Sequence, residues 1–407
     1  MSASSRPKIP NVSQHGFSSF RTDLFGRIKT SEPYSLFDSS HRYEQNGDFS
    51  DITAESATIT YDQYQSTALL NVTTTSGSKV YRESKKVFPY QPGKSLQVLQ
   101  TFCFAPAKTN LRQRVGYFSR QNGFYLEQDG TSVYLVKRSY ITGSVVETRV
   151  AQSNWNVDPL NGSGPSDMTL DLSKSQILWS EYEWLGVGSV RIGFAIDGFF
   201  IPIHVFNHAN QINTTYMTTA TLPVRYEIEN TGSTNSASTM KQICVSVVSN
   251  GGYFKSSNIK TAIRSSATVG TDYYPLIALR MATGRMDSVI VPGVVNLFPT
   301  TADDFEYALI KNPSTITGGS WVLHPSGNVE YNVSATAMAN DGEHLSDGFF
   351  GSTNQSTSSE SADARNFAFQ LGRTNSDTPV SDIFILAVKA VAGTGNVKSS
   401  LGWYDLL

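Results

Sequence analysis

Apolar and polar residues alternate in short runs along most of the chain, with a period of two. Between about residues 50 and 255 these runs are rich in Val, Ile, Thr, Tyr and Phe, and turn residues separate them roughly every 8 to 15 positions. Alternation of this kind is typical of strands with one buried face, and little of the span has a helical period. The pattern predicts an all-β fold with a jelly-roll or β-sandwich core over residues 46–255.

The pattern changes after this core. Residues 256–275 are polar and are predicted to be a linker. Strand-like runs then resume and predict a second, C-terminal β-rich domain over 276–407, with a polar loop at 351–366.

The first 45 residues differ from the rest of the chain. They begin with a polar, Pro-containing stretch, and Gly26 and Pro33 cut short any helix that the following apolar residues would form. We therefore predict an extended docking arm over 1–45 with one short turn. It is expected to dock on a neighbouring subunit in preference to its own core. The apolar side chains expected to dock are Phe17, Phe20, Leu24, Phe25, Tyr34 and Phe37.

The stretch VRIGFAIDGFFIPIHVFNH, residues 190–208, predicts a β-hairpin. Its Asp-Gly pair at 197–198 suits a type I′ turn, and Pro202 favours an edge strand or a bulge. His204 and His208 would share one strand face about 13 Å apart, at about 3.3 Å per residue. That separation is too large for one metal ion. We expect hydrogen-bonded histidines at a sheet edge or a subunit contact, and no metal site.

Glu181 and Glu183 form the best candidate for catalysis. They lie two apart on a predicted strand, with Trp179 on the same face, so their carboxyl groups would be about 6 to 7 Å apart. Pairs of carboxylates near that distance cleave glycosidic bonds. The alternative, which we prefer, is a solvated or inter-subunit face on which the two carboxylates pair with arginines such as Arg191 or Arg225.

A Gly/Pro/Asn-rich loop at 154–167 raises the question of a calcium site. It contains Asp158 and Asp167 and many backbone carbonyls, which are the oxygen ligands that calcium takes. The alternating DxDxDG spacing is missing, so a long ordered turn is the preferred interpretation.

Composition narrows the function further. The 407 residues carry a formal net charge of -2, and 16% are charged, without a run of Lys or Arg, so nucleic-acid binding is not expected. The sequence has no run of about 18 apolar residues, so no membrane-spanning segment is expected. The first residues do not resemble a secretory signal. The two cysteines are too few for a disulfide scaffold, and no cofactor-binding or hydrolase motif occurs. We expect synthesis and assembly in a cytoplasm, and no cofactor.

Several motifs in one order resemble virion structural proteins of tailed bacteriophages, especially marine and cyanobacterial ones. The resemblance covers about residues 20 to 255 and stops there. It rests on FGRIKTSEPYSLFDSSHRY (25–43), YQPGKS (90–95), RVGYF (114–118), NGFYLEQDG (122–130), VAQSNWNVDPLNGSGPS (150–166), the region around 183–198, HANQ (208–211) and LPVRYEI (222–228).

The resemblance implies a virion component without enzymatic activity, made and assembled in the host bacterial cytoplasm. A tail position (fibre, baseplate or neck) is favoured, with a capsid decoration or cement protein as the alternative and a polysaccharide-cleaving tailspike as a third hypothesis. The expected partners are further copies of the chain, as a trimer or higher oligomer, and other virion proteins. A host surface carbohydrate or receptor is a further candidate partner for the C-terminal region.

Overall fold

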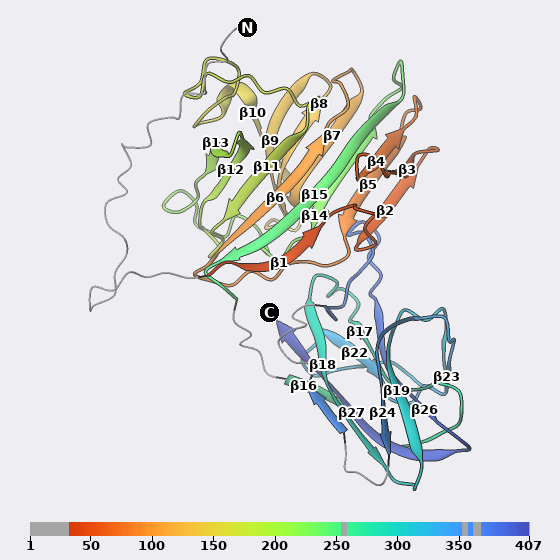
Figure 1. Ribbon diagram of the computed structural model, residues 1–407. Helices are drawn as coiled ribbons and strands as arrows, with labels where there is room; N and C mark the ends of the chain where they lie inside the picture. Colours follow the sequence, from red (N-terminus) through yellow and green to blue (C-terminus); the bar gives the residue numbers. More distant parts are fainter. Residues whose placement is uncertain (1–31, 254–258, 352–356, 361–367, 407) are drawn as a thin grey trace. The chain divides into compact units, whose positions relative to one another are not determined.

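The computed structural model describes residues 32–253, 259–351, 357–360 and 368–406 (Figure 1). These residues form strands and turns, with one 3-10 turn at Gln152–Asn154 and no α-helix among them. The prediction of an all-β fold is confirmed. The chain divides into two compact units: unit 1 comprises residues 1–84 and 88–254, and unit 2 comprises residues 85–87 and 255–407.

Unit 1 is a sandwich of two antiparallel sheets. The eight-stranded sheet contains β1 (Tyr34–Ser39), β3 (Thr58–Asp62), β4 (Thr67–Val72), β6 (Ser95–Cys103), β11 (Gln176–Tyr182), β12 (Val190–Ile196), β13 (Phe199–Phe206) and β15 (Ser238–Asn250). Its order is β13-β12-β11-β6-β15-β4-β3, and β1 also pairs with β15. The seven-stranded sheet contains β2 (Phe49–Ala54), β5 (Lys79–Ser84), β7 (Leu111–Phe118), β8 (Gly123–Asp129), β9 (Ser132–Ser139), β10 (Val146–Ala151) and β14 (Val224–Asn230), in the order β10-β9-β8-β7-β14-β5-β2.

Strand alternation builds the core of unit 1. Every second residue of β6 is buried, among them Leu96, Val98 and Phe102. In β14 the buried apolar residues Val224 and Tyr226 alternate with charged ones. The inward faces of the two sheets therefore supply the core, and charged residues of β14 go to the outer face of the seven-stranded sheet.

The predicted docking arm does not extend to residue 45. Residues 34–39 form β1, which pairs with β15 from Tyr34↔Ser249 to Ser39↔Val245. Phe37 is 7% exposed, and its ring lies 5.1 Å from that of Phe88. The apolar side of residues 34–39 thus packs on the core of its own unit. An apolar pattern in the sequence looks the same whether it packs on its own unit or on a neighbouring subunit. Residues 1–31, with Phe17, Phe20, Leu24 and Phe25, lie outside the described residues.

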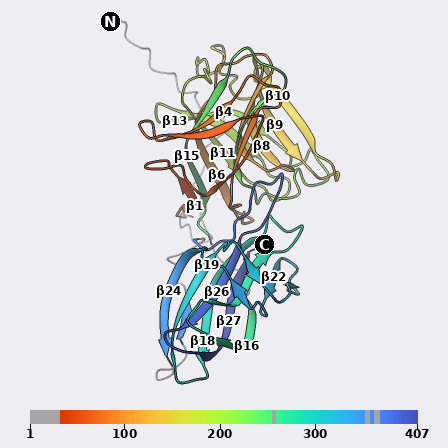
Figure 2. The same ribbon diagram turned by 90° about the vertical axis from the view of Figure 1, so that its right-hand side faces the viewer.

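Unit 2 contains a four-stranded and a six-stranded sheet and one short two-stranded ladder (Figure 2). The first has the order β16-β27-β18-β25 and contains β16 (Ile259–Val269), β18 (Val289–Pro299), β25 (Thr357–Glu360) and β27 (Gly395–Leu406). The second has the order β21-β22-β17-β26-β19-β24 and contains β17 (Tyr274–Met281), β19 (Asp304–Lys311), β21 (Val322–Leu323), β22 (Val329–Asn332), β24 (Glu343–Gly351) and β26 (Ile383–Ala390). The ladder joins β20 (Ile316–Thr317) to β23 (Ala337–Met338). Residues of both larger sheets share one apolar core, which includes Leu276, Phe305, Leu386 and Trp403.

The predicted linker at 256–275 is also wrong. Most of it is β16, the edge strand that pairs with β27. Ala262, Ala267 and Val269 are buried, while most of the residues between them are polar and exposed or half-buried. The polar residues of 256–275 are therefore largely those on the solvated face of an edge strand, and this segment is not a linker between domains.

Candidate functional site

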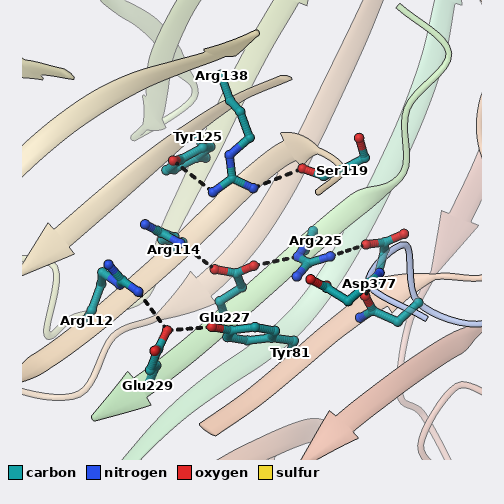
Figure 3. A network of polar contacts seen from close by, with 12 residues as sticks. Tyr81, Arg112, Arg114, Ser119, Tyr125, Arg138, Arg225, Glu227, Glu229 and Asp377 are labelled. Carbon is teal, nitrogen blue, oxygen red and sulfur yellow. Dashed lines mark hydrogen bonds and ion pairs between the residues drawn. The ribbon is translucent and has the colours of Figure 1, made fainter. Parts of the chain in front are cut away.

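Charged side chains on the outer face of the seven-stranded sheet form a densely connected polar network (Figure 3). The register places Arg114 of β7 directly between Glu127 of β8 and Glu227 of β14. Because side chains of one face stand opposite each other on neighbouring strands, opposite charges at these positions meet across the ladder.

These contacts join into one row of alternating charges. Arg114 donates from Nε to Glu127 at 2.6 Å and from a terminal nitrogen to Glu227 at 3.0 Å. Arg225 donates from Nε to Glu227 at 2.6 Å. Arg225 also pairs with Glu83, and Arg149 pairs with both Glu127 and Asp129. Followed from contact to contact, the row, which we call the charge row, reads Glu83, Arg225, Glu227, Arg114, Glu127, Arg149, Asp129.

Most of the charge row is buried, although it is on an outer face. The side chains of Arg225, Glu227 and Arg114 are 2%, 4% and 8% exposed. Aromatic rings on the same face contribute to this burial. The guanidinium of Arg225 lies 5.1 Å from the ring centroid of Tyr81, and that of Arg114 lies 5.2 Å from that of Tyr125. Cation–π contacts of this kind stabilise a desolvated guanidinium.

A second group of contacts continues the same face towards β10. Arg138 of β9 pairs with Glu147 at 2.7 Å and lies over the ring of Phe118, 5.3 Å from its centroid. The hydroxyl of Tyr125 also donates to Glu147, at 2.7 Å. Phe118, Tyr125 and Val136 form a small buried cluster on this outer face. The face therefore consists of rings covered by arginines, whose charges the carboxylates balance.

The electrostatics of the charge row determine what it can do chemically. Burial opposes ionisation of Glu227, but the positive charges of Arg225, Arg114 and Arg138 outweigh burial and lower its pKa to about 2. Burial also opposes ionisation of Glu147, and there the charge of Arg138 and the Tyr125 hydrogen bond lower the pKa overall. A general acid near neutral pH needs a raised carboxyl pKa. Glu227 and Glu147 are suited to holding arginines in place and not to donating protons.

The predicted hairpin at 190–208 is confirmed. β12 and β13 pair antiparallel, and Asp197 and Gly198 have φ values of 51° and 83°, as a type I′ turn requires. β13 is an edge strand, and its register shifts so that Ile192 pairs with His204 while Gly193 pairs with Pro202.

This bulge corrects the predicted faces of the histidines. With an extra residue in the strand, His204 points to the inner side with Ile192, away from the face of Pro202. His204 Nδ1 accepts a hydrogen bond from the Asn156 backbone N–H at 3.1 Å. His208 lies beyond the end of the strand and donates from Nδ1 to the Gly188 carbonyl at 2.8 Å. Among the described side chains, no three His, Cys, Asp or Glu come together as metal ligands would.

Glu181 and Glu183 do not form a matched pair. Glu181 accepts a hydrogen bond from Ser95 Oγ at 3.0 Å and lies 3.8 Å from Arg191. Glu183 follows the end of β11 and is exposed. Arg225, the other arginine that we considered as a partner, belongs to the charge row on the other sheet. One carboxylate is thus held by neighbours on its own sheet, and the other lies in a loop.

Asp158 organises the loop at 154–167 through hydrogen bonds. Both of its carboxylate oxygens accept backbone N–H groups, from Leu160 and Ser166, each at 2.9 Å. Asp158 is 1% exposed, whereas Asp167 is exposed and has a φ of 56°. The loop is therefore the ordered turn that we preferred over a calcium site.

Comparisons with known proteins leave the family open. No family model and no curated protein sequence matches the chain. Among solved structures, a Bacteroides ovatus mixed-linkage glucan GH16 protein has 10% identity and a TM-score of 0.36, covering 52% of this chain and 99% of that one. The Bacillus licheniformis β-glucanase has 12% identity and a TM-score of 0.33, covering 54% and 99%. A CBM2 module of the evolved Dit protein of Lactobacillus casei BL23 phage J-1 has 6% identity and a TM-score of 0.35, covering 56% and 100%. Similarity this weak assigns no ligand or activity to the chain.

The chain is a β-sandwich protein with a second β-rich unit, and its described residues contain no helix long and apolar enough to cross a membrane. The charge row is the feature that sequence reasoning missed. Its signal was present, because LRQRVGYF, GFYLEQDG and LPVRYEIEN each contain charged residues two positions apart.

Proposed function

We propose that the chain is a non-enzymatic structural component of a tailed-phage virion, on the tail as part of a fibre, baseplate or neck, where it serves assembly. The ordered motifs of residues 20–255 support the virion assignment. The observation that supports the absence of enzymatic activity is the charge row, because it gathers seven ionisable side chains on one face and these side chains pair with one another.

A catalytic face keeps at least one acid, base or nucleophile available to the substrate. Here Arg114 and Glu227 each have two ionic partners on the same face. Opening the row to a substrate would leave buried charges without partners, which is strongly unfavourable. A network of this kind makes the sheet stiff and specifies one strand register, as a repeated building block of a symmetric assembly requires.

The proposal is tested by locating the protein on purified virions of the phage that encodes it. Antibody–gold labelling viewed by negative stain should mark the tail or neck, and quantitative mass spectrometry should give a few to tens of copies per particle. Label over the head, with a copy number near that of the major capsid protein, would replace the tail assignment with a decoration protein. Absence of both label and peptides from virions would overturn the proposal.

The competing hypothesis is a depolymerase that uses Glu181 and Glu183. The contacts of Glu181 with Ser95 and Arg191 argue against it, because they occupy both carboxylate oxygens. Purified protein should clear no halo on a lawn of the host. If it does, and if Glu181→Gln or Glu183→Gln abolishes the halo while the protein stays folded, the non-enzymatic assignment is wrong.

A further inference from the structure

The strand β10 has an open edge. It is the terminal strand of the seven-stranded sheet, and its residues 146–149 are all exposed (Figure 2). Among the described residues, only β9 pairs with the backbone of 146–149. Trp155 reaches β10 further along, where its indole N–H donates to the Val150 carbonyl at 3.3 Å. Alternate residues of an edge strand turn their N–H and C=O groups away from the sheet, so β10 can accept a further strand.

The edge strand of the other sheet shows what a covered edge looks like. On β13, Asn156 makes two hydrogen bonds to the backbone of Val205, each at 2.9 Å. The N–H groups of Val157 and Asp158 both reach the carbonyl of Ile203 at 3.1 Å. A loop thus takes the place of a further strand there. No described loop bonds to the first four residues of β10 in this way.

The sequence of β10 is complementary to itself when it is read in the opposite direction. The strand begins VETRV, and Thr148 is the middle residue of this stretch. An antiparallel second copy centred on Thr148 places Glu147 opposite Arg149 at two positions. It also places Val146 opposite Val150 at two positions. Opposite charges directly across a strand pair stabilise the pair, whereas like charges destabilise it.

Both charged residues keep atoms available for a second partner. Within its own unit Glu147 is bound through Oε1 alone, which accepts from Tyr125 and Arg138. Arg149 contacts its two carboxylate neighbours through one terminal nitrogen. The side chains of Glu147 and Arg149 are 31% and 37% exposed. The second carboxylate oxygen of Glu147 and the other nitrogens of Arg149 can therefore meet across a pair of strands without breaking these contacts.

We propose that two copies of the chain pair through β10, antiparallel and centred on Thr148, so that their seven-stranded sheets join into one continuous sheet. Main-chain hydrogen bonds of the added strand supply the affinity, and the two Glu147–Arg149 ion pairs fix the register. Because Arg149 belongs to the charge row, these ion pairs also connect the charge rows of the two copies. Both copies use the same surface, so the contact closes as a two-fold dimer, and a larger assembly needs a further contact. The proposal concerns the free protein and does not rest on a place in a virion.

Charge reversal tests both the strand and its register. Analytical ultracentrifugation of the full chain over a concentration series should show a dimer. Glu147→Lys and Arg149→Glu each place like charges opposite each other twice, so each variant alone should associate about tenfold more weakly, or weaker still. Mixed in equal amounts, the two variants should form a heterodimer, because one β10 then carries two positive charges and the other carries two negative ones. Native mass spectrometry identifies the heterodimer by its mass.

The matched control is Arg191→Glu, which reverses a 53% exposed arginine on the other sheet of unit 1 and should leave the dimer unchanged. Misfolding cannot imitate the expected result, because two misfolded variants would not restore association on mixing. If either reversed chain fails to fold, Thr148→Lys replaces the pair: it places two like charges side by side on the two-fold axis and should weaken the dimer to a similar extent. An unchanged chain that stays monomeric, a dimer that survives both reversals, or a mixture of folded variants that stays monomeric would overturn the proposal.

Discussion

Gly164 lies so close to the carboxylate of Asp158 that a side chain at position 164 would collide with it. A Cβ built on Gly164 would be 2.0 Å from Oδ1 of Asp158. The buried carboxylate therefore takes the space that the missing side chain leaves, and from there it accepts the two backbone N–H groups that shape the loop.

Asp158→Asn should destabilise unit 1 by about 1–3 kcal/mol, because an amide N–H donor would replace one acceptor and face a backbone N–H. Chemical denaturation measures the loss. Asp167→Asn, at an exposed position of the same loop, should change stability by less than about 0.5 kcal/mol. Added calcium should leave the melting temperature unchanged, and a clear rise would restore the calcium hypothesis.

The charge row predicts a large difference between two arginine substitutions. Arg114→Met removes one partner from each of two buried carboxylates, Glu127 and Glu227, and should cost about 3 kcal/mol or more. Arg191→Met removes an exposed partner of Glu181 and should cost at most about 1 kcal/mol. Urea unfolding of both variants gives the comparison, and similar losses would show that the row contributes no more than a surface pair.

Two histidines predict how the stability of unit 1 depends on pH. Burial lowers the pKa of His204 to about 4, and burial together with the charge of Arg82 lowers the pKa of His41 to about 4. Each Nδ1 accepts a backbone N–H, from Asn156 and Asn46 respectively, and protonation would abolish that acceptor. Below pH about 6.5 the unfolded chain binds more protons than the native one, so stability should fall as pH drops from about 6.5 to 4.

The expected loss is on the order of 2 kcal/mol for each histidine over that window. His204→Gln should make the unfolding free energy of unit 1 less dependent on pH, whatever its effect at pH 7. His344→Gln, at an exposed position in unit 2, should leave that dependence unchanged. Unfolding of unit 1 followed at several pH values would contradict the assignment if the His204 variant kept the full slope.

The backbone conformation of the hairpin turn lets us predict how much stability a side chain at Gly198 would cost. Its φ of 83° is unfavourable for other residues, so Gly198→Ala should destabilise unit 1 by about 1 kcal/mol. A methyl group there would meet no neighbour, so the loss would report backbone strain alone. Gly47→Ala, also without neighbours but without a positive φ, should be neutral or slightly stabilising in the same melting experiment.

Two truncations separate the contribution of β1 to stability from that of residues 1–31. Removing residues 1–31 should leave unit 1 folded, because β1 begins at Tyr34. Removing residues 1–45 deletes β1, uncovers the ring of Phe88 and opens one side of β15, so we expect loss of stability and aggregation. Unfolding and light scattering of the two truncated chains measure this, and equal behaviour would mean that β1 is dispensable.

Local patterns in the sequence predicted local structure well. The Asp197-Gly198 turn, and the edge strand or bulge expected at Pro202, both follow from backbone preferences of a few neighbouring residues; the strand is an edge strand, and its register shifts next to Pro202. The direction of His204 could not be predicted, because one inserted residue reverses every later side chain and the insertion point depends on the partner strand.

Features that depend on strand order were not predictable from the chain alone. Arg114 and Glu227 are 113 positions apart, and only the pairing of β7 with β14 brings them together. The same holds for β1 and β16, whose composition resembled an arm and a linker. Both are strands because a partner elsewhere in the chain offers them an edge.

The order in which strands enter the sheets has a consequence for synthesis on the ribosome. β15, the last strand of unit 1, pairs with β6, β4 and β1, and β27, the last strand of the chain, lies between β16 and β18. A nascent chain leaves the ribosome from its N-terminus. The sheets of each unit can therefore be completed only after a central strand that is translated last. Such non-local pairing forms slowly and leaves strand edges uncovered in the meantime. Premature termination near the C-terminus should therefore be far more damaging to unit 2 than its few missing residues suggest, and the chain depends on completed translation before it can become a building block.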